Sequence, residues 1–141
     1  MFMVFTAMDR YRSFVHIILI ALLYAAALSV CSATQMEVST TTADSVIRNT
    51  RNVVVIDVRT PEEFIIGHLP RAKNIDFYDV AFIDSLALLP KDATIVVYSR
   101  AGNRSTEAAL ILESLGYSRT FNMLAGFLAW KNEGRPVAKG K

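Results

Sequence analysis

Short apolar blocks alternate with amphipathic segments from Met36 to the end of the chain. Residues 53–56 and 94–98 form two continuous blocks rich in β-branched side chains, which is typical of strands buried on both faces of a parallel sheet. Several of the segments between such blocks place apolar residues three or four positions apart, the spacing of a helix with one buried face. We therefore predict a small α/β domain with a central parallel sheet flanked by helices.

Capping and helix-breaking residues divide this pattern into further elements. A short edge strand is expected at residues 37–38, with Ser39 or Thr40 as the N-cap of the following helix, and a last strand at residues 119–122. Helices are predicted at residues 42–48, 78–89 and 126–132, in a short segment opening with Pro61, and in a segment marked by Ala108, Leu112 and Leu115 and ended by Gly116.

The start of the chain has a different pattern. Residues 14–30 form an uncharged, strongly apolar run of 17 residues that follows Arg10 and Arg12. A basic segment before an apolar run is typical of an export signal, and this run is nearly long enough to span a bilayer. We therefore predict that residues 1–33 are a signal peptide or membrane anchor and that residues 34–141 are the folded domain.

Three fates of this leader stay open on the sequence. It could be cleaved after Ala33, where small residues precede the bond; it could remain as an anchor; or Cys31, in an imperfect lipobox, could carry a lipid. In each case we expect the domain to be exported to the periplasm or the extracellular space, or held at a membrane through residues 14–30.

Composition and charge narrow the classes of function. The chain carries 15 lysine and arginine residues against 13 aspartate and glutamate residues, and the basic residues are scattered. Binding of nucleic acid, which uses clustered basic and aromatic residues, is therefore not expected. Cys31 is the only cysteine, so we expect no disulfide within one chain, no cysteine-based metal site and no metal or cofactor.

The loop after the second buried block is the best candidate for chemistry. It runs Ser99-Arg100-Ala101-Gly102-Asn103-Arg104 directly from a strand into a helix. A loop wrapped over a helix N-terminus can aim several backbone N–H groups at one point and bind an anion there. Arg100 and Arg104 would add positive potential at its rim. The alternative is a plain connection between strand and helix.

Three motifs carry a resemblance to a known family. Residues 56–64 (IDVRTPEEF), followed by 67–69 (GHL) and 72–75 (AKNI), resemble the first signature of rhodanese-like domains. Residues 124–130 (LAGFLAW) are similar to the C-terminal signature, and residues 97–105 (VYSRAGNRS) to the active-site loop. The resemblance covers residues 36–137 and implies a three-layer domain. It departs from the family at Ala125, where glycine is usual, and at Pro70-Arg71, where one residue followed by glycine is usual.

The resemblance also implies what residue 99 would do. In this family the first residue of the loop is a cysteine that takes up sulfur as a persulfide, and here that position holds Ser99. A hydroxyl has a far higher pKa than a thiol and needs an adjacent base to act as a nucleophile. We therefore expect a catalytically inactive domain that binds a small anion such as thiosulfate, sulfate or phosphate, or a protein partner, through this loop.

Two other functions stay open. The domain would be a sulfurtransferase if Ser99 replaced a native cysteine or if a partner held the sulfur, and it would be a purely structural interaction domain if the loop bound nothing. An acid–base role of Asp57 and Arg59 is less favoured than a structural one, with Asp57 accepting backbone N–H bonds and Arg59 pairing with Glu62 or Glu63. Structural roles are likewise expected for His68, Gly126 and Trp130, with His68 hydrogen-bonded and Trp130 in the core beside Phe127.

Overall fold

The computed structural model describes His16 and residues 35–140. The predicted leader therefore lies, apart from His16, outside the described residues, and its fate stays a prediction. None of the helices within the described residues is long and apolar enough to cross a membrane.

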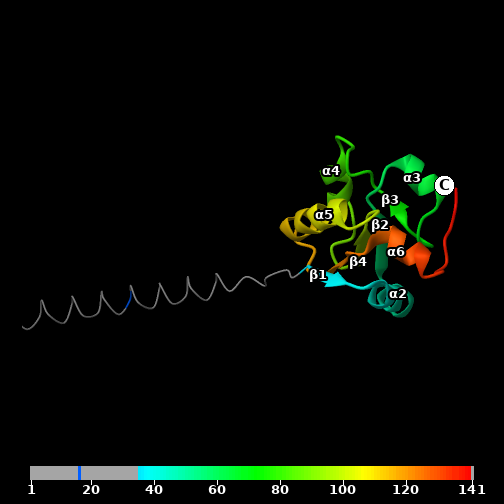
Figure 1. The fold of residues 1–141 in the computed structure, drawn as a ribbon. Helices are drawn as coiled ribbons and strands as arrows, with labels where there is room; N and C mark the ends of the chain where they lie inside the picture. The colour runs from blue at the N-terminus through cyan, green and yellow to red at the C-terminus, as the bar shows by residue number, and fades with distance from the viewer. Residues whose placement is uncertain (1–15, 17–34, 141) are drawn as a thin grey trace, which may run out of the picture. The chain divides into compact units, whose positions relative to one another are not determined.

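A five-stranded parallel sheet forms the centre of the domain (Figure 1). Its order is β1-β5-β4-β2-β3. The strands are β1 (Met36–Val38), β2 (Val53–Asp57), β3 (Lys73–Asn74), β4 (Thr94–Tyr98) and β5 (Thr120–Met123). Every residue of β4, the middle strand, is buried. This parallel sheet flanked by helices confirms the predicted fold class.

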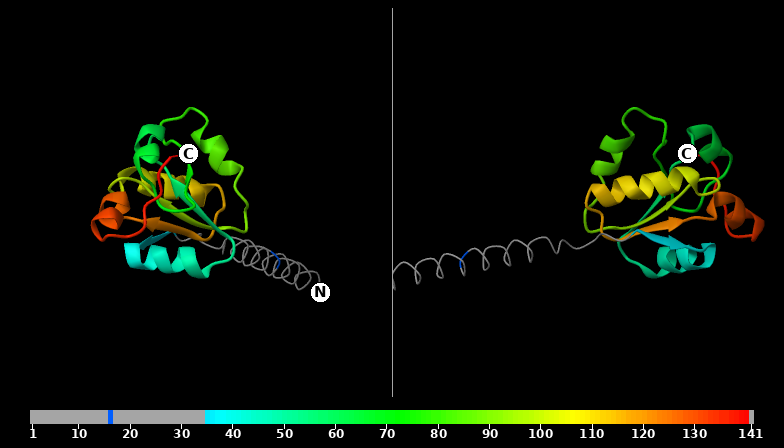
Figure 2. Two further views of the ribbon diagram at one scale, coloured as in Figure 1. Left: turned by 90° about the vertical axis from the view of Figure 1, so that its right-hand side faces the viewer. Right: turned by 60° about the vertical axis from the view of Figure 1, so that its left-hand side comes forward.

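Helices cover both faces of the sheet and make the three layers (Figure 2). α2 (Thr40–Asn49) and α6 (Gly126–Asn132) pack on one face through a cluster that includes Ile47 and Trp130. α4 (Phe82–Ala87) and α5 (Asn103–Ser114) pack on the other through a cluster that includes Leu86 and Leu112. Of the predicted inward residues, Ala108, Leu112, Phe127 and Trp130 are buried in these clusters, and Leu115, which follows α5, is partly buried against the second one.

The strand order creates a topological switch point between β2 and β4, at the centre of the sheet. From β2 the chain continues through α3 (Pro61–Ile66) to β3 on one side, whereas from β4 it continues through α5 to β5 on the other side. Connections that leave two neighbouring parallel strands in opposite directions open a crevice at their carboxyl ends, where ligands bind in open α/β sheets. In this domain that crevice lies between residue 99 and the segment after Asp57.

Polar side chains fix where the first two described helices begin. The Ser39 hydroxyl accepts the Thr42 N–H at 3.2 Å, so α2 starts at Thr40, two residues before the predicted start. α3 starts with a capping box, in which Thr60 accepts the Glu63 N–H and the Glu63 carboxylate accepts the Thr60 N–H.

The helix predicted at residues 78–89 is much shorter in the structure, because the carboxylates of two aspartates accept hydrogen bonds from backbone N–H groups in its first part. Asp76 accepts the Tyr78 N–H at 3.0 Å and Asp79 accepts the Ala81 N–H at 2.8 Å. Such local bonds compete with helix formation and favour turns, and α4 consequently begins only at Phe82.

Two other boundaries differ by one or a few residues. β5 extends to Met123 because this residue pairs with Val38 of the edge strand β1, a distant partner in the sequence. α5 begins at Asn103, so the last two residues of the predicted loop belong to its first turn. Gly116 ends this helix as predicted, with a positive φ of 88°.

Candidate functional site

A pocket of about 480 Å³ opens at the crevice between the carboxyl ends of β2 and β4. It is lined by Thr60, Glu63, Tyr78, Ser99, Arg100, Ala101, Asn103 and Arg104. Five of these residues come from the predicted loop, and the other three come from α3, its N-cap and the turn before α4. The structure thus brings the loop against segments that lie about 20 to 40 positions earlier in the chain.

Ser99 lies at the base of this pocket and is 1% exposed. Its Oγ accepts the Gly102 N–H at 3.1 Å and lies 3.5 Å from the Ser105 Oγ. The Ser105 hydroxyl in turn donates to the Gly102 carbonyl at 2.9 Å. The first loop residue is therefore held in a small hydrogen-bonded ring that also fixes the beginning of α5.

Two glycines allow the loop backbone to pack closely against α6 and the residues just before it. A Cβ on Gly102, whose φ is 93°, would lie 2.4 Å from the Leu124 carbonyl oxygen. A Cβ on Gly126, whose φ is 68°, would lie 2.5 Å from the Arg100 carbonyl oxygen. The structure thus places Gly126 directly against the loop, where only a residue without a side chain fits.

Backbone hydrogen bonds complete this contact. Phe127 and Leu128 donate their N–H groups to the carbonyl oxygens of Ser99 and Arg100, at 2.8 and 3.2 Å. The first-turn N–H groups of α5, which include those of the pocket-lining Asn103 and Arg104, have no intrahelical acceptors, as at any helix N-terminus. This arrangement can bind an anion, because helix N-termini carry a partial positive charge.

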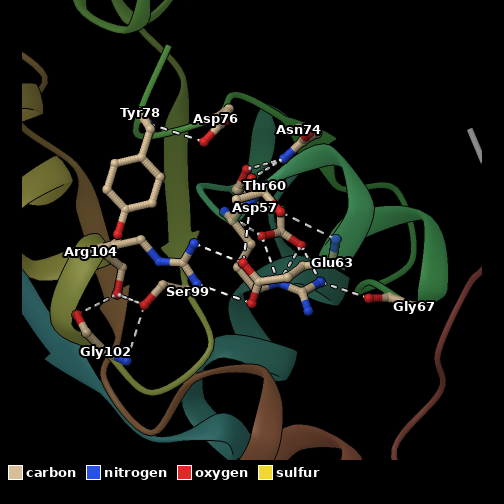
Figure 3. Close-up of polar contacts among 12 residues, drawn as sticks. Asp57, Thr60, Glu63, Gly67, Asn74, Asp76, Tyr78, Ser99, Gly102 and Arg104 are labelled. Carbon is tan, nitrogen blue, oxygen red and sulfur yellow. Dashed lines mark hydrogen bonds and ion pairs between the residues drawn. The ribbon is translucent and has the colours of Figure 1, made fainter.

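Arg104 crosses the pocket to Glu63. Its two terminal nitrogens donate to the two carboxylate oxygens at 2.8 and 3.1 Å (Figure 3). The guanidinium lowers the pKa of Glu63 and the carboxylate raises the pKa of Arg104. The Arg104 guanidinium also lies over the Tyr78 ring, 5.8 Å from its centroid. Its charge is thus largely compensated, whereas Arg100 is exposed and forms no ion pair with any described residue.

Asp57 and Arg59 form a second ion pair, which is buried below the crevice. The Arg59 Nη2 donates to the Asp57 carboxylate and to the Gly67 carbonyl, each at 2.6 Å. The prediction that Arg59 pairs with Glu62 or Glu63 is therefore wrong. The Arg59 N–H and Nε also donate to Asp57, so the carboxylate two residues earlier binds the guanidinium before it can reach α3.

Aromatic side chains surround this buried pair. The Arg59 guanidinium lies 4.1 Å from the Phe127 ring centroid and 5.7 Å from that of Tyr98. The Tyr98 hydroxyl accepts the Leu69 N–H at 3.0 Å. Burial and the nearby Asp57 carboxylate raise the pKa of Tyr98 far above its ordinary value, so this phenol stays neutral.

The other predicted site residues lie away from the pocket. His68 is buried, stacks on Phe64 with ring centroids 3.7 Å apart, and has its Nδ1 2.9 Å from the Phe64 carbonyl oxygen. Trp130 is 2% exposed and donates its indole N–H to the Pro136 carbonyl oxygen at 2.8 Å. Neither of them lines the pocket at Ser99.

Sequence reasoning missed three residues of the pocket: Thr60, Glu63 and Tyr78. The Thr60-x-x-Glu63 spacing is a capping-box signal that places the Glu63 carboxylate at a helix start, although it does not reveal Arg104 as a partner. No local pattern indicates Tyr78, because its place at the pocket depends on the turn built by Asp76 and Asp79.

These contacts define what the pocket can do chemically. Among the described residues, the hydroxyl of Ser99 has hydrogen-bonding contacts only with Gly102 and Ser105, and neither can act as a base. A serine nucleophile needs such a base within hydrogen-bonding reach. The described residues also bring together no group of three or more histidine, cysteine, aspartate or glutamate side chains that could hold a metal ion.

Comparisons with known proteins agree on one family. A family model described as a rhodanese-like domain matches residues 42–133. A sulfurtransferase of Allochromatium vinosum is 33% identical over 91 residues, which are 64% of this chain and 83% of that protein. The thiosulfate sulfurtransferase GlpE of Pseudomonas aeruginosa is 35% identical over 78 residues, which are 55% of this chain and 69% of GlpE.

A longer relative and two solved structures extend the comparison. The probable adenylyltransferase/sulfurtransferase MoeZ of Mycobacterium tuberculosis is 35% identical over 86 residues, 61% of this chain but only 22% of MoeZ. A rhodanese-related protein from Thermoplasma volcanium has a TM-score of 0.61 at 28% identity, covering 74% of this chain and 96% of that one. The polysulfide-sulfur transferase homodimer of Wolinella succinogenes, at 22% identity and a TM-score of 0.64, shares the fold over 84% of this chain and 89% of its own.

Proposed function

The chain belongs to the rhodanese-like domain family, and on this premise we propose that it is a non-catalytic member that binds a small anion at the loop of residues 99–104. Thiosulfate, sulfate and phosphate are the anions we consider. The observation that carries the proposal is the environment of Ser99, which is buried and, within the described part of the chain, is hydrogen-bonded through its Oγ only to Gly102 and Ser105, neither of which is a base.

The loss of catalysis rests on the correspondence of Ser99 to the family's cysteine. A persulfide forms when a thiolate attacks a sulfane sulfur, and the sulfur stays covalently bound to the enzyme. The Ser99 oxygen offers no stable equivalent of this intermediate. Cys31, the only cysteine of the chain, lies in the predicted leader and not in the loop.

Anion binding rests on groups that do not depend on a cysteine. The first-turn N–H groups of α5 have no intrahelical acceptors, and the side chain of Arg100 is exposed at the rim. Because the Arg104 charge is compensated by Glu63, Arg100 and the helix N-terminus provide most of the attraction. We expect modest affinity, in keeping with an open pocket.

Sulfur transfer is the second candidate, because three of the relatives are named as sulfurtransferases. It would require the sulfur to be carried by a partner's cysteine, with this domain binding the persulfide or the sulfur donor. The two candidates differ in one outcome: only the second predicts turnover by the serine protein when a thiol partner is supplied.

The deciding experiment compares thiocyanate formation from thiosulfate and cyanide by the protein and by Ser99→Cys. We expect no turnover above background with Ser99, with or without a low-molecular-weight thiol, and measurable turnover with Ser99→Cys. Ser118→Cys, which adds a thiol at an exposed position of the same domain, is the matched control and should stay inactive. Turnover by the serine protein would refute the non-catalytic assignment.

Anion binding is tested separately by thermal unfolding. Thiosulfate, sulfate or phosphate at millimolar concentration should raise the Tm in a dose-dependent way, and Arg100→Ala should reduce this shift more than Arg51→Ala does. Arg51 is an exposed arginine in a turn remote in sequence from the loop. Equal melting curves with and without these anions would indicate a purely structural loop.

We also propose that the leader, residues 1–33, exports the domain or holds it at a membrane. Expression of the full chain, fractionation and N-terminal sequencing test this directly. A product that starts at Thr34 would show cleavage, and an intact membrane-bound product would show an anchor. A full-length product in the cytosol would contradict export.

A further inference from the structure

A second pocket, of about 250 Å³, lies between α2, the turn before β3 and α6. It shares no lining residue with the pocket at Ser99. Its apolar wall is formed by Ile47, Leu69, Pro70, Trp130 and Pro136. The Trp130 indole N–H is already bound to the Pro136 carbonyl, so this wall offers the faces of side chains rather than free polar groups.

The charges at this pocket do not cancel. Three charged residues line it: Asp44, Arg48 and Arg71. Asp44 accepts hydrogen bonds from the Arg48 Nε at 2.8 Å and from the Arg135 Nη1 at 3.1 Å. Arg135 is also paired with Glu133 at 2.6 Å, so these two carboxylates compensate both arginines. Arg71 forms no ion pair and no hydrogen bond with any other described residue, and its side chain is exposed. A single uncompensated positive charge therefore stands beside an apolar wall.

The backbone at Arg71 is strained for an arginine. The Ala72 N–H donates to the Leu69 carbonyl oxygen at 3.1 Å, which closes a four-residue turn with Pro70 at the second position and Arg71 at the third. The φ of Arg71 is 67°, the only positive φ of a described residue other than glycine. Proline at the second position and a positive φ at the third define a type II turn, in which glycine is strongly favoured at the third position.

An arginine in this position lowers stability relative to glycine, because its Cβ crowds the backbone in the left-handed region. Strained residues of this kind cluster at active sites and ligand-binding sites. Here the side chain puts a guanidinium at the rim of an apolar pocket, and a guanidinium binds a carboxylate through two parallel hydrogen bonds.

We propose that the pocket between α2, the Leu69–Ala72 turn and α6 binds a small amphipathic carboxylic acid, with its apolar body against Pro70 and Pro136 and its carboxylate on Arg71. The volume corresponds to about eight water molecules, which suits a short aliphatic chain or one aromatic ring. This site goes beyond the proposed anion site at Ser99 and does not depend on it.

Trp130 is the only tryptophan of the chain and lines the pocket, so its fluorescence reports binding. The purified full chain is titrated with 4-phenylbutyrate and with 4-phenylbutanol, which has the same apolar body without the charge, with any solubilising agent held constant. We expect saturable binding of the acid, about fivefold tighter than that of the alcohol, the size of one partly exposed ion pair.

Arg71→Gly separates binding from folding. It should abolish the preference for the acid and at the same time raise the Tm, by about 4 °C or more, because the strain is removed. Arg71→Lys should keep most of the preference, and Arg51→Gly, in an exposed turn, should leave the preference unchanged. Equal affinity for acid and alcohol, or an undiminished preference in Arg71→Gly, would overturn the proposal. A lower Tm in Arg71→Gly would show that the arginine stabilises the turn. Backbone strain would then no longer support a functional role of the Arg71 side chain.

Discussion

Two arginine–carboxylate pairs lie at the same end of the sheet and differ in their burial and in the groups that surround them. The side chains of Asp57 and Arg59 are 0% and 4% exposed, and the pair is enclosed by Phe127, Tyr98 and the Gly67 carbonyl. Glu63 and Arg104 are 29% and 16% exposed and line the candidate site. Both pairs use close, charge-assisted hydrogen bonds, so distance alone does not distinguish them.

This difference in burial indicates which of the two pairs the stability of the fold depends on. Removing one member of a buried pair leaves a charge without water or partner, which costs far more than the pair itself contributes. A pair at a pocket rim keeps access to water, so its members can be exchanged at small cost. We therefore assign Asp57 and Arg59 to the stability of the domain, and Glu63 and Arg104 to the electrostatics of the pocket.

The largest effect is expected from breaking the buried pair. Arg59→Met keeps much of the side-chain volume but leaves the Asp57 carboxylate uncompensated and the Gly67 carbonyl without its donor. The free energy of unfolding should fall by about 3 to 5 kcal/mol, as measured by chemical denaturation. Arg51→Met, on an exposed turn, is the matched control and should change it by less than about 0.5 kcal/mol.

A double variant sharpens this prediction. Adding Asp57→Asn to Arg59→Met removes the second charge, and the loss should then be smaller than the sum of the two single losses, because the buried charge is no longer orphaned. Strictly additive losses would show that the two side chains contribute independently, which would contradict the assignment of one buried, coupled pair.

The next largest effect tests whether the loop backbone belongs to the rigid part of the molecule. Gly126→Ala would force a Cβ to within 2.5 Å of the Arg100 carbonyl oxygen at a φ of 68°. We expect a loss of about 2 kcal/mol or more together with a weaker anion-induced rise in Tm. Gly134→Ala, where φ is also 68° but nothing lies within 4 Å, isolates the conformational cost from the contact with the loop. Equal losses in both would exclude a specific role of that contact.

A smaller effect is expected from the exposed pair. Glu63→Gln keeps the shape of the side chain but removes its charge, so stability should fall by only about 1 kcal/mol or less. Arg104 would then carry an uncompensated charge at the pocket, and the rise in Tm with sulfate or phosphate should increase. A decreased response would indicate that Glu63 positions Arg104 for the anion rather than neutralising it.

The smallest expected effect is the pH dependence of the stability that the Glu63–Arg104 pair contributes, and this effect is specific to that pair. The Arg104 guanidinium lowers the pKa of Glu63 below its ordinary value of 4.5. A carboxylate with a lowered pKa contributes stability that is fully present above the unfolded pKa and is lost as the pH falls through the folded pKa. The stability difference between the protein and Glu63→Gln should therefore be constant near neutral pH and shrink below about pH 4.5. An unchanged difference at low pH would contradict this ion pair.

Much of this architecture is visible in the sequence, because it depends on local patterns. Continuous β-branched runs gave the positions of β2 and β4 to within a residue, and Gly126 to Asn132 was predicted as the closing helix with the bounds observed. The loop after Tyr98 was predicted as a strand-to-helix connection. These features follow from propensities and from periodicity over a few neighbouring residues.

Which side chains contact each other depends on the tertiary structure and could not be read from the sequence. The sequence placed Arg59 near Glu62 and Glu63, but the closed geometry around Asp57 binds it first, and Glu63 instead meets Arg104 across the pocket, 41 positions later in the chain. The turn at Asp76 and Asp79 shortened a helix and brought Tyr78 to the site. Local sequence sets which elements form because backbone preferences act between near neighbours, whereas ion pairs and pockets depend on how those elements pack, and packing brings together residues that no local pattern connects.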